Sequence, residues 1–166
     1  MSTVLICADR SNHSDFALEY YLKHVHREGN TVKIVHCPEY WANVRPMEGP
    51  SLLRMPSIAP LVISVPTGPT PARLNELIAE TNANTAAIAD KVKTTLAAAG
   101  VTGEFVKLEG KEPWQEICKA ADSLGANLIV LGTRGVGTIK RTLLGSCSDS
   151  VMHHAHCPVL VCKHNA

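Results

Sequence analysis

The segment with the clearest chemical potential runs from residue 132 to residue 150 and reads GTRGVGTIKRTLLGSCSDS. Its glycines follow the spacing Gly132-x2-Gly135-x9-Gly145, and Ser146 comes next. Because glycine has no Cβ, Gly132 can turn the chain sharply after a strand, and Gly135 can let backbone approach a ligand closely. Gly145 and Ser146 open a predicted helix, whose unused amides and positive dipole end favour an anion. The spacing predicts phosphate binding; the alternative is a connection that is merely rich in glycine.

Two better-known phosphate loops do not fit this segment. A Walker A loop needs glycine-lysine-serine/threonine, and that order does not occur. Gly135-Val136-Gly137 begins a dinucleotide fingerprint, but Lys140 stands where the third glycine belongs. The hydroxyls of Ser146 and Ser148 would suit phosphate oxygens or a hydrated metal. Arg134, Lys140 and Arg141 would suit triphosphate charge. A solvated basic face explains all three equally well, and it is the favoured interpretation for Lys140 and Arg141.

The elements that must position this segment alternate between apolar runs and helical patterns. We expect strands at residues 3–8, 31–37, 104–108, 127–131 and 158–162, and helices at 14–27, 71–99, 113–124 and 145–153. This alternation is typical of a parallel sheet with helices on both faces. The fold class is therefore α/β, a single Rossmann-like domain over residues 1–166 with a five-stranded, mainly parallel sheet. In such a sheet a ligand binds beyond the carboxyl ends of the strands, where the strand order reverses.

Two helices have predicted inward faces, and one region resists assignment to either helix or strand. The face of the first helix is Phe16, Ala17, Tyr20, Tyr21, His24 and Val25, and that of the long helix is Leu74, Leu77, Ile78, Ile88, Val92 and Leu96. Residues 38–71 hold eight of the 10 prolines. Proline at that density excludes helix interiors and central strands, so a long loop is expected there.

Two stretches at opposite ends of the chain resemble the universal stress protein family. The segment GTRGVGTIKRTLLGSCSDSVMHHAHCPVLVCK resembles the family's carboxy-terminal signature, and its glycines match the G-x2-G-x9-G-[ST] pattern of ATP-binding members. The opening VLICADRSNHSDFALEYYLKHV resembles the family's first strand, aspartate, serine and first helix. The resemblance covers nearly the whole chain except residues 38–71. It implies a cofactor, ATP, with magnesium accompanying it.

The resemblance also implies which residues would contact the nucleotide. Asp9 would contact the adenosine, and the backbone at Ala8 and Cys37 would flank the adenine. The ribose and phosphate side would be lined by Leu131, Gly132, Arg134 and Gly135, and the phosphates would be held by Gly145, Ser146, Cys147 and Ser148. Arg10 and Cys147 depart from the family's usual small residue and β-branched residue. An aspartate such as Asp9, taken alone, is more often a strand-end cap than a ligand contact, but its position where the strand order reverses favours the contact.

Other reactive residues give weaker predictions. The run His153, His154, Ala155, His156, Cys157 suggests a metal, but adjacent residues on a helix point about 100° apart and converge poorly. We expect no metal there and no catalytic residues, because no serine or cysteine has a recognisable base partner. The six cysteines are expected to be reduced thiols. Residues 1–8 lack a basic region before their apolar run, so no secretory signal is expected.

The composition limits the kinds of partner that we expect for this protein. A net charge of +1 gives no reason to expect nucleic acid or an anionic membrane as partner, and no stretch approaches the roughly 18 apolar residues of a membrane span. We expect a cytoplasmic, ATP-binding regulatory protein, with an unidentified protein partner and a homodimer formed through the edge strand Pro158–Cys162. The alternatives are a slow ATP hydrolase or nucleotidyl transferase on the same fold, and an interaction module that has lost its ligand.

Overall fold

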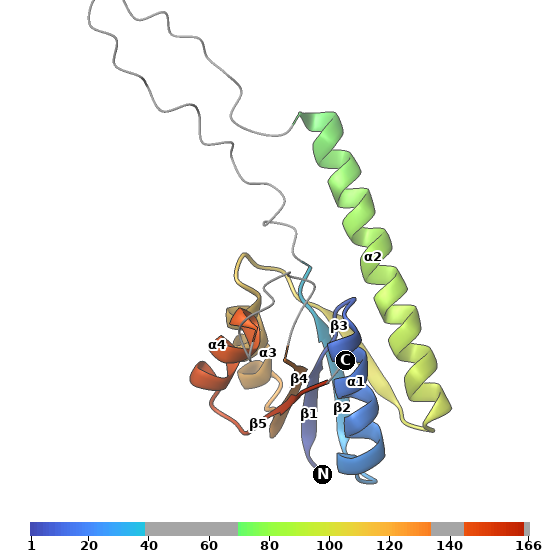
Figure 1. The fold of residues 1–166 in the computed structure, drawn as a ribbon, viewed down its shortest axis with the longest axis vertical. Coiled ribbons are helices and arrows are strands. Elements are labelled where there is room, and N and C mark those ends of the chain that lie inside the picture. Colours follow the sequence, from blue (N-terminus) through green and yellow to red (C-terminus); the bar gives the residue numbers. More distant parts are fainter. Residues whose placement is uncertain (39–69, 134–144, 165–166) are drawn as a thin grey trace, which may run out of the picture.

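The computed structural model describes residues 1–38, 70–133 and 145–164 (Figure 1). Within these ranges the strands are β1 (Thr3–Cys7), β2 (Thr31–His36), β3 (Gly103–Lys107), β4 (Leu128–Gly132) and β5 (Val159–Cys162). The helices are α1 (Asn12–Tyr20), its π-helical continuation η1 (Tyr21–Val25), α2 (Pro71–Ala98), α3 (Pro113–Ser123) and α4 (Ser146–His154). The predicted order of elements is confirmed, with boundaries that differ by one or two residues. The predicted loop over residues 38–71 lies almost wholly outside the described residues.

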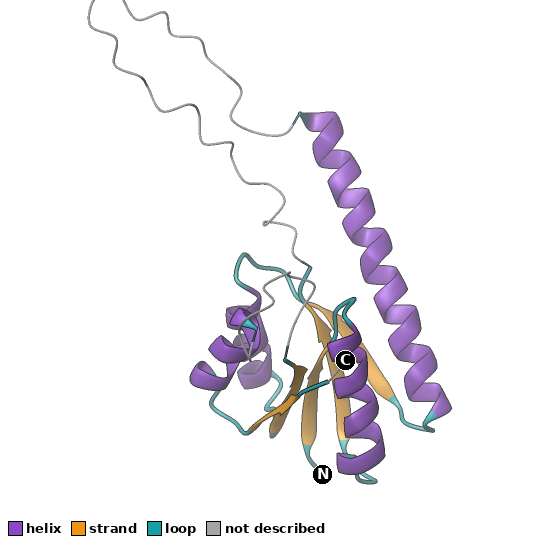
Figure 2. Cartoon of the chain, in the orientation of Figure 1, coloured by secondary structure: helices purple, strands orange, loops and turns teal. Residues whose placement is uncertain are grey.

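The five strands form one sheet in the order β3-β2-β1-β4-β5, and every neighbouring pair is parallel. β1 lies at the centre, where Ile6 pairs with Ile34 of β2 on one side and with Val130 of β4 on the other. β3 and β5 are the two edges, and the alternating polarity of β3, GEFVK, suits an edge strand. Figure 2 shows helices covering both faces of this sheet.

Alternate strand residues supply two separate cores. The first contains Val4, Ile6, Val32, Ile34 and Val130 of the sheet with residues of α1 and α2. The second contains Leu5, Val35, Ile129 and Leu131 with residues of α3 and α4. Because successive side chains of a strand point to opposite faces, a strand buried on both faces must be apolar throughout. The continuous runs VLI and LIVL meet that requirement.

The inward face of α1 differs from the prediction. Ala17 and Tyr21 are buried as expected, but Tyr20 is 40% exposed and His24 is exposed. Tyr20 is the last residue of α1, and His24 lies in the π-helical turn η1 that follows, in which the amide of His26 donates to the carbonyl of Tyr21 at 2.8 Å. A π-helical turn is wider than an α-helical one, so His24 leaves the face that a 3.6-residue period predicts.

The ends of α2 follow the prediction, but its first turns do not. Thr70 caps the helix by accepting from the amide of Arg73 at 3.3 Å, and Gly100, with a φ of 69°, ends it. Ile88, Val92 and Leu96 are buried, whereas Leu74 and Leu77 are half-buried and Ile78 is 37% exposed. Figure 1 shows why: the amino-terminal part of α2 extends beyond the carboxyl ends of the strands, where no sheet underlies it. Within the described ranges no helix combines the length and apolarity needed to cross a membrane.

Candidate functional site

The sheet changes direction of winding between β1 and β4. α1 and α2 pack on one face in the first core, and α3 and α4 pack on the other face in the second core. The helices that follow β1 and β4 therefore leave toward opposite faces of the sheet. Open α/β sheets bind ligands beyond the carboxyl ends of two such strands, and we refer to this position as the crevice. β1 ends at Cys7 and is followed by Ala8 and Asp9; β4 ends at Gly132. The residues predicted for the adenosine and phosphate sides thus lie on adjacent strands, about 5 Å apart in a sheet.

Asp9 organises the turn from β1 into α1. Its Oδ1 atom accepts from the amide of Ser11 at 2.8 Å and from the hydroxyl of Ser11 at 2.6 Å. Its backbone amide donates to Ser14 Oγ at 3.0 Å, and that hydroxyl reaches the carbonyl of Asp9 at 3.2 Å. The carboxylate is partly exposed, and among the described residues its Oδ2 atom has no hydrogen-bond partner. Asp9 is therefore both a strand-end cap and a carboxylate with one oxygen left to accept from a ligand hydroxyl.

Gly132 has a different role from the sharp turn predicted for it. It still belongs to β4, and its φ is not positive. A Cβ at this position would lie 2.5 Å from the carbonyl oxygen of His13 and 2.6 Å from the His13 carbonyl carbon. The glycine is needed because the first turn of α1 crosses the end of β4 at close range. Gly132 thus fixes the distance between α1 and β4 at the crevice.

The amino end of α4 faces the same edge of the sheet. Gly145 is its N-cap residue, with φ −72° and ψ 152°, an extended conformation that any residue adopts. The helical ladder begins with Asp149, whose amide donates to the Gly145 carbonyl at 2.9 Å. The amides of a helix's first turn precede that ladder and carry the positive end of the dipole. The backbone conformation at residue 145 therefore does not by itself require glycine.

Ser148 fastens the start of α4 to the end of β4. Its side chain is 3% exposed, and its hydroxyl donates toward the carbonyls of Thr133 at 3.2 Å and Gly145 at 2.9 Å. The amide of Gly145 also donates to the Thr133 carbonyl. A serine hydroxyl has one proton to donate, and here carbonyls of the protein accept it. Ser148 therefore contributes its position in the first turn of α4 more than a hydroxyl directed at phosphate.

The remaining predicted residues divide into two groups. Ala8 is buried, Cys37 is half-buried directly after β2, and Leu131 is buried in the second core. Arg134 and Gly135 lie outside the described residues. Ser146 is exposed at the first position of α4, and Cys147 packs against the second core.

Sequence reasoning missed two buried polar residues, His36 and Ser14, which hold the backbone at the carboxyl end of β1. The Nδ1 atom of His36 lies 2.8 Å from the carbonyl oxygen of Ala8. The signal available in the sequence was position alone: each is a polar residue next to the end of a predicted apolar strand or in the first turn after it. Neither residue type by itself indicates such a role.

Several thiols lie beneath the crevice in the second core. Burial raises the pKa of the Cys7 thiol well above its usual range, and the nearby Cys147 thiol and Asp9 carboxylate act in the same direction. Burial likewise raises the pKa of Cys118 and of Cys157, each with a further contribution from Asp122. Thiols held protonated in this way are poor nucleophiles and poor metal ligands.

The histidines near the carboxyl terminus point to separate partners. His154 Nδ1 lies 2.8 Å from the Ser150 carbonyl, His156 Nδ1 lies 3.2 Å from Asp122, and His153 Nε2 lies 3.8 Å from Asp149. Among the described residues no group of three or more histidine, cysteine or carboxylate side chains is arranged to hold a metal ion.

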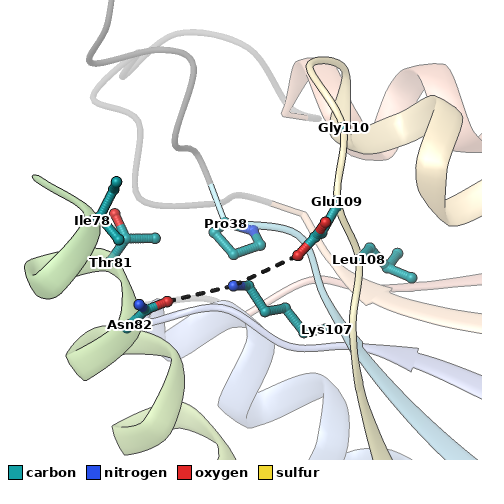
Figure 3. Close-up of a pocket in the computed structure, with 8 residues that line it drawn as sticks. All are labelled: Pro38, Ile78, Thr81, Asn82, Lys107, Leu108, Glu109 and Gly110. Atoms are coloured by element: carbon teal, nitrogen blue, oxygen red, sulfur yellow. Dashed lines mark hydrogen bonds and ion pairs between the residues drawn. The ribbon is translucent and has the colours of Figure 1, made fainter. Parts of the chain in front are cut away.

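A cavity of about 350 Å³ opens at the same edge of the sheet, between α2 and the loop that follows β3 (Figure 3). Pro38, Leu108 and Ile78 give it apolar walls. Lys107 spans it: its Nζ atom lies 3.4 Å from Asn82 Oδ1 on α2 and 4.0 Å from Glu109 Oε1 (Figure 3). Pro38 directly follows Cys37, so the cavity begins where the predicted adenine position ends. Its volume is within the usual range of small-molecule sites.

Comparison with known sequences agrees with this geometry. The family model described as "Universal stress protein family" matches residues 56–163. Universal stress protein MJ0531 of Methanocaldococcus jannaschii is 45% identical over 73 residues, which cover 44% of this chain and 42% of the relative. Universal stress protein PHOS34 of Arabidopsis thaliana is 26% identical over 162 residues, which cover 96% of this chain and 60% of the relative. The chain thus spans between 42% and 60% of the length of these curated relatives.

Solved structures share the fold along nearly the whole chain. Hypothetical protein MJ0577 superposes with a TM-score of 0.72 at 21% identity, over 99% of this chain and 97% of that one. A universal stress protein in complex with cAMP superposes with a TM-score of 0.62 at 23% identity, over 99% and 98%. A family member from Arabidopsis thaliana with AMP bound gives 0.62 at 17% identity, over 100% and 94%. At these identities the likeness shows the α/β fold.

Proposed function

The chain belongs to the universal stress protein family, and on that premise we propose that it binds ATP at the carboxyl edge of its sheet and acts as a nucleotide-dependent regulatory protein. The observation that carries the proposal is the pairing of two features on the adjacent strands β1 and β4. Asp9 offers a carboxylate oxygen to a ribose hydroxyl, and the amino end of α4 offers amides to phosphate. Family neighbours with AMP and with cAMP support an adenine nucleotide as the ligand class.

The nucleotide would span the edge of the sheet from α4 toward α2. Its phosphates would lie at Gly145 and Ser146, with Arg134, Gly135 and an accompanying magnesium ion as further proposed contacts. Its base would pass between Ala8 and Cys37 and face the cavity that begins at Pro38. The apolar walls of that cavity suit a planar base, and Lys107 and Asn82 supply polar atoms at its far side.

Regulation would follow from the structural elements that a bound nucleotide connects. The site draws on β1, β2 and α4, so occupancy would restrain α4 relative to the carboxyl ends of these two strands. We propose that this restraint, or a homodimer formed through Pro158–Cys162, is what a protein partner reads. The cysteines of the described residues form no disulfide with one another, which suits the reducing cytoplasm where we place the protein.

The test is calorimetric titration of ATP into the wild type and a Gly145→Val variant. The extended backbone at residue 145 accepts valine without strain, so any loss comes from the side chain standing where phosphate must approach the amides. We expect affinity to fall at least tenfold, about 1.4 kcal/mol. Glu112→Val is the matched control, because Glu112 caps α3 without a side-chain hydrogen bond. Equal affinity in wild type and Gly145→Val would refute the phosphate assignment.

A further inference from the structure

His36 lies where β1 and β2 separate at the carboxyl edge. It is 8% exposed at the end of β2, and its Nδ1 atom lies 2.8 Å from the Ala8 carbonyl oxygen. A carbonyl only accepts, so Nδ1 carries the proton and donates. The amide of Ala8 donates to the Val35 carbonyl at 2.8 Å, so both backbone polar groups of Ala8 are held by β2.

The next step of a regular parallel ladder would bring a backbone amide to the same carbonyl. With Ala8 donating to Val35, the ladder's next donor to the Ala8 carbonyl is the amide of Cys37. Here a side-chain donor from His36 reaches that carbonyl at an ideal distance. The imidazole thereby sets the spacing at which the two strands diverge, between the two backbone positions proposed to flank the base.

The same hydrogen bond fixes the residue that follows Ala8. In a strand, the backbone groups of successive residues point to opposite sides, so pinning Ala8 toward β2 turns the amide and carbonyl of Asp9 away from it. Both of those groups are held by Ser14 Oγ. The backbone of Asp9 is therefore held on both sides, while its carboxylate is held by Ser11 through Oδ1. The Phe105 ring, stacked at 6.4 Å from the imidazole, supports His36 from β3.

We propose that His36 is a positioning residue for the nucleoside end of the ligand: its hydrogen bond to Ala8 keeps the gap between β1 and β2 open to a base and aims the Asp9 carboxylate. This rests on the proposed nucleotide site. It assigns His36 no contact with phosphate, whose contacts come from α4. Loss of the hydrogen bond should weaken ligands that carry the nucleoside and leave phosphate-only ligands unaffected.

The test compares two variants in the full chain. His36→Phe keeps a ring for Phe105 but removes the donor, and His36→Asn keeps a donor, because the Asn amide nitrogen occupies the place of Nδ1. Titrations with ATP, AMP and inorganic tripolyphosphate give three affinities for each protein. We expect His36→Phe to weaken ATP and AMP about tenfold, to leave tripolyphosphate within twofold, and His36→Asn to restore nucleotide binding to within threefold of the wild type.

A control separates positioning from stability. Tyr21→Phe removes a buried hydroxyl that lies 3.1 Å from His26 Nδ1, in the η1 turn before β2 begins. It should lower the melting temperature and leave all three affinities unchanged. Unchanged ATP and AMP affinities in His36→Phe, an equal loss for tripolyphosphate, or no rescue by His36→Asn would each overturn the inference. A wild type that binds neither ATP nor AMP would overturn the proposed function, and this inference with it.

Discussion

Replacing Gly132 with alanine tests how closely α1 approaches the end of β4. The new Cβ would lie 2.5 Å from the carbonyl oxygen and 2.6 Å from the carbonyl carbon of His13. Both atoms belong to the backbone of the first turn of α1, which cannot rotate aside as a side chain does. To restore an ordinary contact of 3.4 Å, the amino end of α1 has to retreat by about 0.9 Å.

Two opposing terms set the size of the effect. Overpacking of this kind costs about 1–3 kcal/mol. Replacing glycine with alanine also restricts the unfolded chain, which stabilises the fold by about 0.4–1 kcal/mol. We therefore expect a net loss of about 1–2 kcal/mol in the free energy of unfolding. For a chain of this size, that lowers the melting temperature by about 2–8 °C.

Urea denaturation and thermal melting of the wild type and the Gly132→Ala variant measure this loss. Gly110→Ala is the matched control: the nearest atoms to its Cβ belong to the Glu116 side chain, which can rotate where backbone cannot, so it should lose less stability than Gly132→Ala. Because Ser11 and Ser14 of α1 hold Asp9, ATP affinity should also fall in Gly132→Ala. A Gly132→Ala variant as stable as the Gly110→Ala control would refute the close approach of α1.

Three further predictions concern pH, assembly and turnover. The free energy of unfolding should fall as pH rises above about 9.0, because the folded protein keeps the Cys7 proton that the unfolded chain releases there. In urea denaturation between pH 8 and 11, Cys7→Ala should reduce this dependence of stability on pH. An unchanged dependence would contradict the burial of that thiol. Val161→Pro should convert the proposed dimer to a monomer in sedimentation velocity. The amides of Ile129 and Thr133 donate to the carbonyls of Pro158 and Cys162, so the Val161 amide lies on the open edge of β5. A monomeric wild type at micromolar concentration would exclude the dimer. Phosphate release with ATP and magnesium should stay below about 1 s⁻¹. The carboxylates that could orient an attacking water are already engaged, Glu116 with Lys119 and Asp9 Oδ1 with Ser11. Multiple turnover near that rate, abolished by Ser146→Ala, would favour the hydrolase.

The fold could be predicted because the strands β1 and β4 have continuous apolar runs and the helices have clear stops. Residues 128–131 and 4–6 permit little other than a strand buried on both faces, and Gly100 and Gly125 end their helices with positive φ. The π-helical turn after Tyr20 could not be predicted, because it depends on how Tyr21 packs against the first core. The exposure of Ile78 depends on where the sheet ends relative to α2, which no local pattern records.

The candidate site was predictable in outline but not in the roles of its members. The glycine spacing indicated the ends of β4 and α4, yet the reason for Gly132 is a contact with His13, which is far away in the sequence. Ser148 reads as a phosphate hydroxyl until its two carbonyl partners are known. His36 carries no sequence signal beyond its place at a strand end. Such roles depend on contacts between distant segments, and a linear pattern does not contain them.

The central position of β1 has a consequence for synthesis of the chain. β1 is made first, but its partner β4 begins at Leu128, and the two are joined at their start by Asn127 bonding with Thr3. A nascent chain that ends before residue 127 can pair β1 with β2 and β2 with β3, but the other edge of β1, with Val4, Leu5 and Ile6, has no strand to pair with. Ribosomes add about 5–20 residues per second, so this apolar edge of β1 stays unpaired for several seconds before β4 is made. The interval between β3 and β4 is therefore when the protein most depends on chaperones.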